Sequence, residues 1–512
     1  MDEQRPSNPD GIPPEDWERT PASVKQLVGL LIQRLEKLEH QYQDLQNQYQ
    51  LLQEQLNRNS SNSSQSPSSD PPQVEKRRRV KSDRNRGGQA GHKGHHRHLF
   101  AAEECASVSD HYPETCVSCG ASLSGEDPNP YRHQTVEIPP VVPQVHEYRL
   151  HQRVCDQCGQ TTRAGLPTGV PCQVYGPRVA ATVGVLSGMY RHSQRMVRQA
   201  MVELFGIPMA LGSVNNLRKQ ASEAVAEPVE AAKEYARQQP VVGSDETSFP
   251  QGNVDGHNPN QCKGWLWVVV TPLVTVFQVF LSRSQQAAQE LLGETFGGIL
   301  ISDRHSAYHW VALVRRQVCW AHLKRDFTKI AERTGVSQAL GEALLEQEKK
   351  LFELWYRVRD GSLTRSEFME AVKPIREQVK LLLTEGAGYA IGPKEKTPLA
   401  KTVRTCRRLL KVEPALWLFV RVEGVEPTNN DSERALRPAV IWRRVSFGSQ
   451  TEEGSTFVAR MLTVVATLRA QNRNVLEYMT QACQAAREGK PAPSLLLLPK
   501  QALAQAQDLF AA

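Results

Sequence analysis

The feature that most constrains the fold of this chain is a seven-residue repeat of apolar side chains between residues 28 and 56. One series comprises Val28, Leu35, Tyr42, Tyr49 and Leu56, and the other comprises Leu31, Leu38, Leu45 and Leu52. A period of about 3.5 residues keeps one apolar seam facing a partner helix. We therefore predict a coiled coil over residues 22–57 and a homo-oligomer formed through it. A lone amphipathic helix packed on its own domain is the alternative.

The length of 512 residues exceeds that of one ordinary domain, which has about 100 to 200 residues. No stretch approaches the roughly 18 uninterrupted apolar residues of a membrane span, and the first residues are acidic and polar, unlike a signal peptide. We therefore expect a soluble, cytoplasmic protein without a membrane partner. In such a reducing compartment, cysteine pairs favour metal binding over disulfides.

Positive charge is concentrated in one segment, although the net charge of the chain is only +7. A Ser/Asn/Pro-rich stretch follows Leu56 and cannot bury enough apolar surface to fold. Residues 76–98 then carry nine Lys/Arg and a single acidic residue, Asp83. We predict a disordered linker and a DNA-binding basic arm over residues 58–99, with a solvated tail as the alternative. The candidate DNA contacts of the arm are Lys76, Arg77, Arg78, Arg79, Lys81, Arg84, Arg86 and Lys93.

Two Cys-x-x-Cys pairs lie in the turn-rich residues 100–175, at Cys116 and Cys119 and at Cys155 and Cys158. Each pair turns two sulfurs toward one point, and two pairs complete a tetrahedral Zn²⁺ site. Four thiolates leave no open position for catalysis. The sequence therefore predicts a structural zinc module, with redox-active or unrelated pairs as the alternatives.

Residues 176–238 have a helical pattern with a break from Gly206 to Pro208. Ser213 is a plausible N-cap of the helix that follows this break. We predict a region that resembles a helix-turn-helix and binds DNA, while a purely structural helical hairpin is the alternative. The polar residues of its second helix are Asn215, Asn216, Arg218 and Lys219.

Two carboxylates follow apolar runs that are typical of buried strands. Asp245 comes after Val241 and Val242, and Asp303 ends the run 299–302. A carboxylate at the end of a buried strand is costly unless a cation or a donor meets it, so two such positions favour a shared metal site. Ordinary surface aspartates at strand ends are the alternative. Between them, two β-branched and aromatic runs around Pro272 predict a hairpin.

Several motifs resemble one known family in the same order along nearly the whole chain. They are GSDETSF, LISDRHSAY, CWAHLKRDF and EPTNNDSERALRPAVIWRRVSFGSQTEEGS, together with GGQAGHKG after the heptads. The chain resembles the bacterial insertion-sequence-66 family of DDE transposases.

This resemblance implies a ribonuclease H-like catalytic core, a mixed sheet flanked by helices, over residues 239–334 and 426–470. A helical insertion would occupy residues 335–425, and a C-terminal helical tail residues 471–512. The resemblance also implies that Asp245, Asp303 and Glu433 are the catalytic residues and bind two Mg²⁺ or Mn²⁺ ions. Glu246 and Asp431 are close competitors in sequence, and only the resemblance excludes them.

Two further groups of residues could act beside the three acids, namely arginines close to Glu433 in sequence and a Cys/His pair in the motif CWAHLKRDF. Arg434 and Arg437, with Arg443 and Arg444, are candidates to contact the DNA backbone, although a solvated helical face would have the same composition. Cys319 and His322 have the spacing of a metal knuckle, but no second ligand pair is visible. We therefore favour a packing or hydrogen-bonding role for them.

The function expected from these features is that of a transposase, which binds the terminal inverted repeats of its element and catalyses metal-dependent cleavage and strand transfer. Its partners would be double-stranded DNA, further copies of the chain and small accessory proteins of the same element. A DNA-binding regulator without catalysis would explain the coiled coil, zinc and basic arm, but not the acids. A nuclease that cuts without joining would share the acids.

Overall fold

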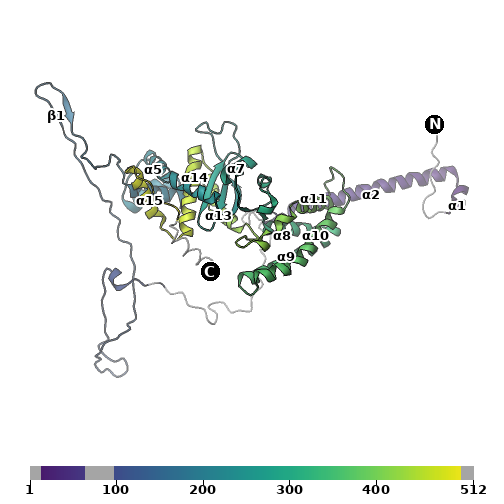
Figure 1. Ribbon diagram of the computed structural model, residues 1–512, viewed down its shortest axis with the longest axis horizontal. Coiled ribbons are helices and arrows are strands. Elements are labelled where there is room, and N and C mark those ends of the chain that lie inside the picture. Colours follow the sequence, from purple (N-terminus) through teal and green to yellow (C-terminus); the bar gives the residue numbers. More distant parts are fainter. Residues whose placement is uncertain (1–12, 64–96, 98, 497–512) are drawn as a thin grey trace.

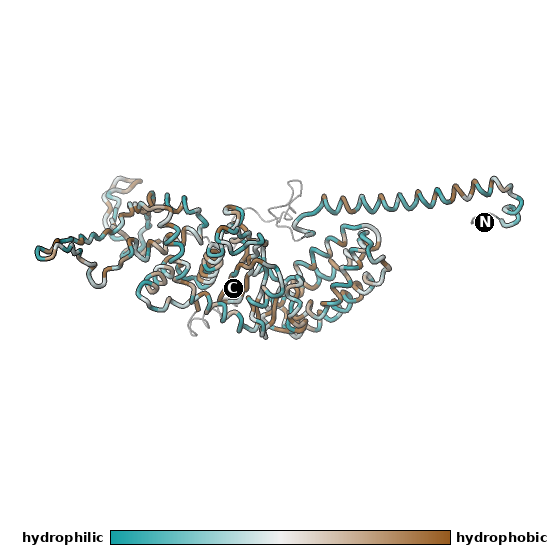
Figure 2. The backbone as a smooth tube through the Cα atoms, turned by 90° about the horizontal axis from the view of Figure 1, so that it is seen from above, coloured by the Kyte–Doolittle hydropathy of each residue, from teal (hydrophilic) through white to brown (hydrophobic). Residues whose placement is uncertain are grey.

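The long helix α2 (Ala22–Leu56) projects from one end of the molecule in the computed structural model (Figure 1). The structure describes residues 13–63, 97 and 99–496. The predicted helix is thus present, and most of its apolar heptad side chains are exposed. Figure 2 shows α2 as a long projecting helix along which hydrophobic and hydrophilic residues alternate. The self-association that would cover them stays a prediction. A short helix, α1 (Pro14–Arg19), precedes α2.

The centre of the molecule is a mixed sheet of five strands in the order β5-β4-β3-β6-β7. Strands β3, β4 and β5 run antiparallel to one another, whereas β6 and β7 run parallel to β3. The predicted hairpin is confirmed as β4 and β5. This topology is compatible with the expected ribonuclease H-like core. The strands are β3 (Val241–Ser248), β4 (Trp265–Val270), β5 (Thr275–Phe280), β6 (Ile299–Ser302) and β7 (Arg316–Val318).

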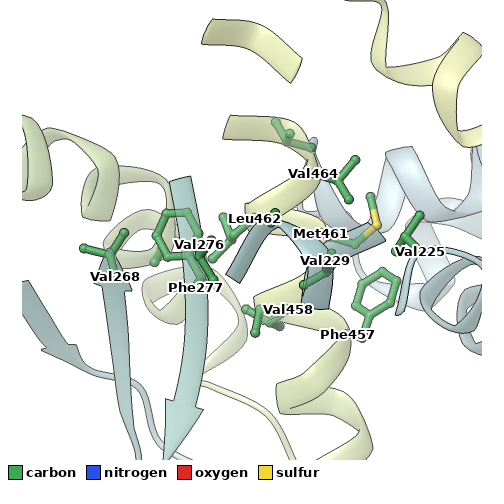
Figure 3. Packing of buried hydrophobic residues seen from close by; sticks show 14 of the residues in the cluster. Val225, Val229, Val268, Val276, Phe277, Phe457, Val458, Met461, Leu462 and Val464 are labelled. Atoms are coloured by element: carbon green, nitrogen blue, oxygen red, sulfur yellow. The ribbon is translucent and has the colours of Figure 1, made fainter. Parts of the chain in front are cut away.

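Helix α14 (Glu452–Ala470) covers the edge of the sheet at β5. The hydroxyls of Thr463 and Thr467 accept hydrogen bonds from the β5 backbone N–H groups of Phe277 (2.9 Å) and Thr275 (3.1 Å). Figure 3 shows Val458 and Leu462 of α14 beside Val276 and Phe277 of β5. The helix therefore satisfies backbone groups that an open sheet edge would leave unpaired.

Further helices form a continuous hydrophobic core with α14 and the sheet. Gly188 allows close packing here, because a Cβ at this position would lie 2.7 Å from the side chain of Met461. The second helix of the predicted helix-turn-helix begins at Leu211, so Ser213 lies inside its first turn and is not the N-cap. These helices are α3 (Pro177–Gly188), α4 (Gln194–Phe205), α5 (Leu211–Glu223), α6 (Ala226–Arg237) and α7 (Gln285–Leu292).

The described part of the predicted C-terminal helical tail is helical and packs on the body of the protein. Helix α15 (Val475–Arg487) packs against α3, and Tyr478 and Met479 are buried in the main core. Helix α15 has an apolar face, and exposing this face to water would be unfavourable. The helix therefore packs this face on the body of the protein.

The predicted helical insertion forms a second hydrophobic cluster beside β6 and β7. Trp320 and Trp417 meet edge-on in it, with ring centroids 5.0 Å apart, so Trp320 is a core residue. The chain then returns to the sheet through α13 (Asn430–Ser446). The cluster comprises α8 (Trp320–Ala331), α9 (Val336–Arg359), α10 (Arg365–Gly388), α11 (Pro398–Lys411), η5 (Glu413–Leu416) and α12 (Leu418–Arg421).

Residues 99–175 run as an extended excursion away from the sheet (Figure 1). Their regular elements are η2 (Ala102–Glu104) and the paired strands β1 (Gln152–Val154) and β2 (Thr161–Arg163). Two short turns, η3 (Ser306–Tyr308) and η4 (Leu313–Arg315), connect β6 to β7. Across the described residues, none of the helices combines the length and apolar character of a membrane span.

Candidate active site

Asp245, Asp303 and Glu433 line one cavity of about 1160 Å³. Asp245 lies within β3, Asp303 directly follows β6, and Glu433 lies in the first turn of α13. Burial and the negative charges of Glu246, Asp303 and, more weakly, Glu433 raise the pKa of Asp245 well above its ordinary value. The fold therefore brings together three carboxylates that are far apart in sequence, close enough to feel one another's charge.

The backbone around Asp303 fixes its position at the end of β6. One carboxylate oxygen accepts a hydrogen bond from the N–H of His305 at 2.8 Å. Its carbonyl accepts another at 2.9 Å from the guanidinium of Arg316, a residue that is 1% exposed. The adjacent Arg304 pairs with Asp326 of α8. These contacts therefore fix the position of Asp303 between the sheet and α8.

Glu246 is next to Asp245 in sequence and lines the same cavity, but the two side chains leave β3 on opposite faces, because side chains alternate along a strand. It accepts hydrogen bonds from the Tyr308 hydroxyl (2.5 Å) and from Nε of Arg283 (2.8 Å). Burial and then the charge of Asp303 raise the pKa of Glu246, against the opposing effect of these two partners. The sequence showed Glu246 as a competitor but gave no sign of Arg283 and Tyr308 as its partners.

Asp431 and Glu433 occupy different environments on α13. The Asp431 side chain is 67% exposed and pairs with Arg434 at 2.5 Å. The Glu433 side chain faces the cavity, and its Oε1 is buried without a hydrogen-bond partner among the described residues. His322 Nδ1 and Arg325 each lie 3.6 Å from a Glu433 oxygen. The geometry therefore favours Glu433 over Asp431 as the third acid.

A cation would fit this acidic centre. The like charges around Asp245 and the unpartnered oxygen of Glu433 are features that a bound divalent ion would compensate. Among the described residues, the ligand atoms that lie within 4.8 Å of one another are those of Cys319, His322 and Glu433, and not those of the three acids. However, burial raises the pKa of Cys319 to about 11, which favours the neutral thiol over the thiolate that binds metals.

Comparison with known proteins identifies the family. Residues 173–456, more than half of the chain, match the family described as Transposase IS66 family. The chain belongs to the IS66 transposase family. Residues 13–98 of this IS66-family chain match a second family, which is described as having unknown function.

Two curated relatives of this IS66-family chain come from Sinorhizobium fredii, and both are named as uncharacterized proteins. The relative y4qI is 26% identical over 279 residues, which are 50% of this chain and 49% of the relative. The relative y4hP is 24% identical over 388 residues, or 70% of this chain and 68% of the relative. The chain thus spans about half the length of one relative and about two thirds of the other.

The acid-bearing elements of this IS66-family chain are joined by buried hydrogen bonds around Asn429. The Asn429 side chain donates to the carbonyl of Ser244 at 2.8 Å, and its backbone N–H donates to Cys319 Sγ at 3.1 Å. The N–H of Cys319 in turn donates to the carbonyl of Ser302 at 2.9 Å. Ser244 precedes Asp245, Ser302 precedes Asp303, and Asn429 precedes α13. Cys319 therefore has the hydrogen-bonding role expected from its sequence, and Asn429 is a positioning residue that sequence reasoning missed.

Basic side chains surround the acids of the cavity. Of the predicted DNA contacts, Arg437 lines the cavity, whereas Arg434 pairs with Asp431 outside it. Lys219 pairs with Glu453 at 3.4 Å, and Arg218 stacks over Phe457 at 4.4 Å. The contacts predicted in the basic arm, Lys76 to Lys93, lie outside the described residues. The cationic residues of the cavity are Arg58, Arg283, Arg304, Arg325, Lys329, Arg437, Arg443 and Arg444.

The two cysteine pairs form matching turns. After each pair a glycine adopts a left-handed conformation, Gly120 with φ +72° and Gly159 with φ +70°. Backbone hydrogen bonds within each turn lower the pKa of the first cysteine, Cys116 or Cys155, and so favour a thiolate. Among the residues that the structure describes, the four sulfurs do not gather within 4.8 Å, so the two turns remain separate.

Proposed function

We propose that the chain is a DNA transposase that binds the ends of its element and catalyses divalent-metal-dependent cleavage and strand transfer. The observation that carries this proposal is the convergence of Asp245, Asp303 and Glu433 in one cavity with a basic rim. A basic rim favours a polyanionic backbone as the substrate, and an acidic centre favours Mg²⁺ or Mn²⁺ beside it. Family membership makes DNA the expected substrate.

In the proposed mechanism, the three carboxylates would hold two divalent ions, whose chemistry would be to activate water or a DNA 3′-hydroxyl and to stabilise the leaving oxygen at phosphorus. Arg437 contacts the DNA backbone on the α13 side of the cavity. The Glu246 carboxylate accepts hydrogen bonds from Tyr308 and Arg283, so in this proposal it stabilises the wall of the cavity and is not a metal ligand. Asn429 and Cys319 keep the elements that carry the acids in register.

The remaining parts are proposed to handle the DNA ends. The two cysteine turns would join around a structural Zn²⁺, since each already favours thiolate at its first sulfur. Together with the α4–α5 helices, this module would recognise the terminal repeats. The coiled coil would pair protomers so that two ends are processed together, and accessory proteins of the element would take part.

The test is to incubate the full chain with labelled element ends and Mg²⁺ and to score nicked and joined products. The Asp303→Asn variant is expected to form both products more slowly by a factor of about 10²–10³, the scale for loss of one electrostatic group, while it still binds the ends. Asp431→Asn is the matched control and should keep its activity. Zinc analysis of the same preparations checks the cysteine module.

Three outcomes would change the assignment. Full activity of Asp303→Asn would refute the role of the triad. Nicked products without joined products would favour a nuclease, and binding without either product would favour a non-catalytic regulator.

A further inference from the structure

The C-terminal end of α2 is docked on the helical insertion, although the rest of this helix projects away from it (Figures 1 and 2). The two parts of α2 therefore differ. The heptad residues Leu38 and Leu45 are 56% and 63% exposed, whereas the Glu54 side chain is only 14% exposed. This docking involves the N-terminal region, for which the family match gives no function.

The first docking contact is a three-residue charge cluster. A carboxylate oxygen of Glu54 lies 2.9 Å from Nε of Arg333, and the other lies 2.7 Å from Nζ of Lys401. Arg333 is itself buried, with a side chain that is 4% exposed, and donates to the Thr402 hydroxyl at 2.6 Å. Removing one partner of a buried ion pair strongly destabilises the folded state, because the other charge stays buried without compensation. Glu54 thus completes a site that the insertion has already built.

The second contact lies beyond the end of α2. Asn62 is 6% exposed, and its side chain donates to Glu332 at 2.7 Å and to the carbonyl of Asn57 at 2.9 Å. Within α2, Gln50 donates to the Thr334 hydroxyl at 2.5 Å. The consecutive residues 332–334 therefore bind α2 and the turn that follows it. This turn is folded on itself, since Asn62 also accepts the N–H of Asn59 at 2.9 Å.

The docked turn reaches the catalytic cavity. Arg58, Asn62 and Ser63 line the same cavity as Asp245, Asp303 and Glu433. The Arg58 side chain is exposed there, and it forms no ion pair with an acidic group of the described residues. Arg325 and Lys329 of α8 line the cavity as well. An unpaired guanidinium beside other cations favours a phosphate as its partner.

We propose that the Glu54 and Asn62 contacts dock the end of α2 on the insertion so that Arg58 binds a backbone phosphate of the DNA in the catalytic cavity. This inference rests on the proposed function, because it takes the ligand of the cavity to be DNA. It gives the N-terminal region a part in the active site as well as in association. The sequence continues from this turn into the Lys/Arg-rich residues 76–98.

The docking is tested in the full-length chain without DNA. Glu54→Lys replaces the carboxylate with a like charge beside Arg333 and Lys401, and Glu39→Lys makes the same change at an exposed position of α2. Amide hydrogen exchange of residues 57–63 is expected to accelerate at least 10-fold in Glu54→Lys and to stay unchanged in Glu39→Lys. Unchanged exchange in Glu54→Lys would overturn the docking.

The phosphate contact is tested by binding of labelled element ends in Ca²⁺. Arg58→Ala is expected to weaken binding several-fold and to reduce the salt slope of the affinity by about 1, as for the loss of one phosphate contact. Glu54→Lys should weaken DNA binding similarly. Because both changes remove the same phosphate contact, the double variant Glu54→Lys/Arg58→Ala should bind DNA as well as the single variant with the lower affinity. Unchanged affinity and slope in Arg58→Ala would overturn the contact. If the wild type binds no DNA while its exchange pattern shows docking, the proposed function fails and the docking stands.

Discussion

At the residue scale, neighbouring carboxylates of β3 differ because the strand turns them to opposite faces. Glu246 has two partners that compensate its burial, Tyr308 and Arg283. Asp245 accepts one local hydrogen bond, from the N–H of Glu246 at 2.9 Å, and faces the charges of other acids. Burial and these charges raise its pKa, so its ionised form is costly in the folded chain without a compensating cation.

We predict that Asp245→Asn stabilises the metal-free chain at neutral pH while it abolishes strand transfer. A raised pKa means that the folded chain binds this proton more tightly than the unfolded chain does. The contribution of Asp245 to stability therefore falls as pH rises from the unfolded pKa of about 3.9 through the folded pKa. The variant should therefore have the higher free energy of unfolding at pH 7, because asparagine carries no charge that burial and the neighbouring acids oppose.

Urea unfolding at several pH values, with and without Mg²⁺, measures this effect. The difference between Asp245→Asn and the wild type should shrink as the pH falls toward about 3, below the unfolded pKa of about 3.9, where the wild-type carboxyl is mostly protonated in both states. Mg²⁺ should stabilise the wild type more than the variant. A variant that is less stable than the wild type at pH 7 without metal would contradict the argument.

At the element scale, the site depends on how closely α13 approaches β3. Gly243 makes this approach possible, because a Cβ there would lie 2.6 Å from the hydroxyl of Ser432. Asn429 then ties the start of α13 to the carbonyl of Ser244 at 2.8 Å. The position of Glu433 relative to Asp245 follows from these two contacts.

We predict that Asn429→Ala weakens Mn²⁺ binding and costs about 1 to 3 kcal/mol of stability, because the buried carbonyl of Ser244 loses its donor. Asn430→Ala changes an exposed neighbour and is the matched control. Calorimetric titration with Mn²⁺ at a temperature well below unfolding separates the two effects. Loss of stability with unchanged Mn²⁺ affinity would show that Asn429 supports the fold without positioning the acids.

At the scale of the whole molecule, the projecting part of α2 presents an apolar seam that nothing in the described chain covers. We predict that Leu38→Lys with Leu45→Lys dissociates the proposed oligomer, because both side chains occupy the heptad seam. Gln43→Lys, which lies outside both heptad series, should leave it intact.

Sedimentation and product analysis check this prediction together. The seam variant should be monomeric, retain nicking at single ends and lose products that require two paired ends. A seam variant with the sedimentation coefficient of the wild type would contradict the coiled coil. Because the docking site around Glu54 lies outside the altered positions, hydrogen exchange of residues 57–63 should not change.

Patterns along the chain were sufficient to predict the features that depend on neighbours in sequence. The heptads predicted the long helix α2, the two apolar runs around Pro272 predicted the hairpin β4–β5, and the apolar run before Asp303 predicted a strand-end carboxylate. Hydrophobic periodicity and turn-forming residues depend on side chains a few positions apart, so these features can be read from the sequence alone. The motif order likewise predicted the family, which the match to residues 173–456 confirms.

Only the tertiary structure decided the features that depend on contacts between distant segments. Asp431 and Glu433 are indistinguishable by local pattern, and the packing of α13 against β3 turns one to solvent and the other to the cavity. The same holds for the partners of Glu246 and for the docking of Glu54 on Arg333, which follows α8, and on Lys401 of α11. A single sequence shows which charges exist, but which of them meet is set by burial and hydrogen bonding across the whole fold.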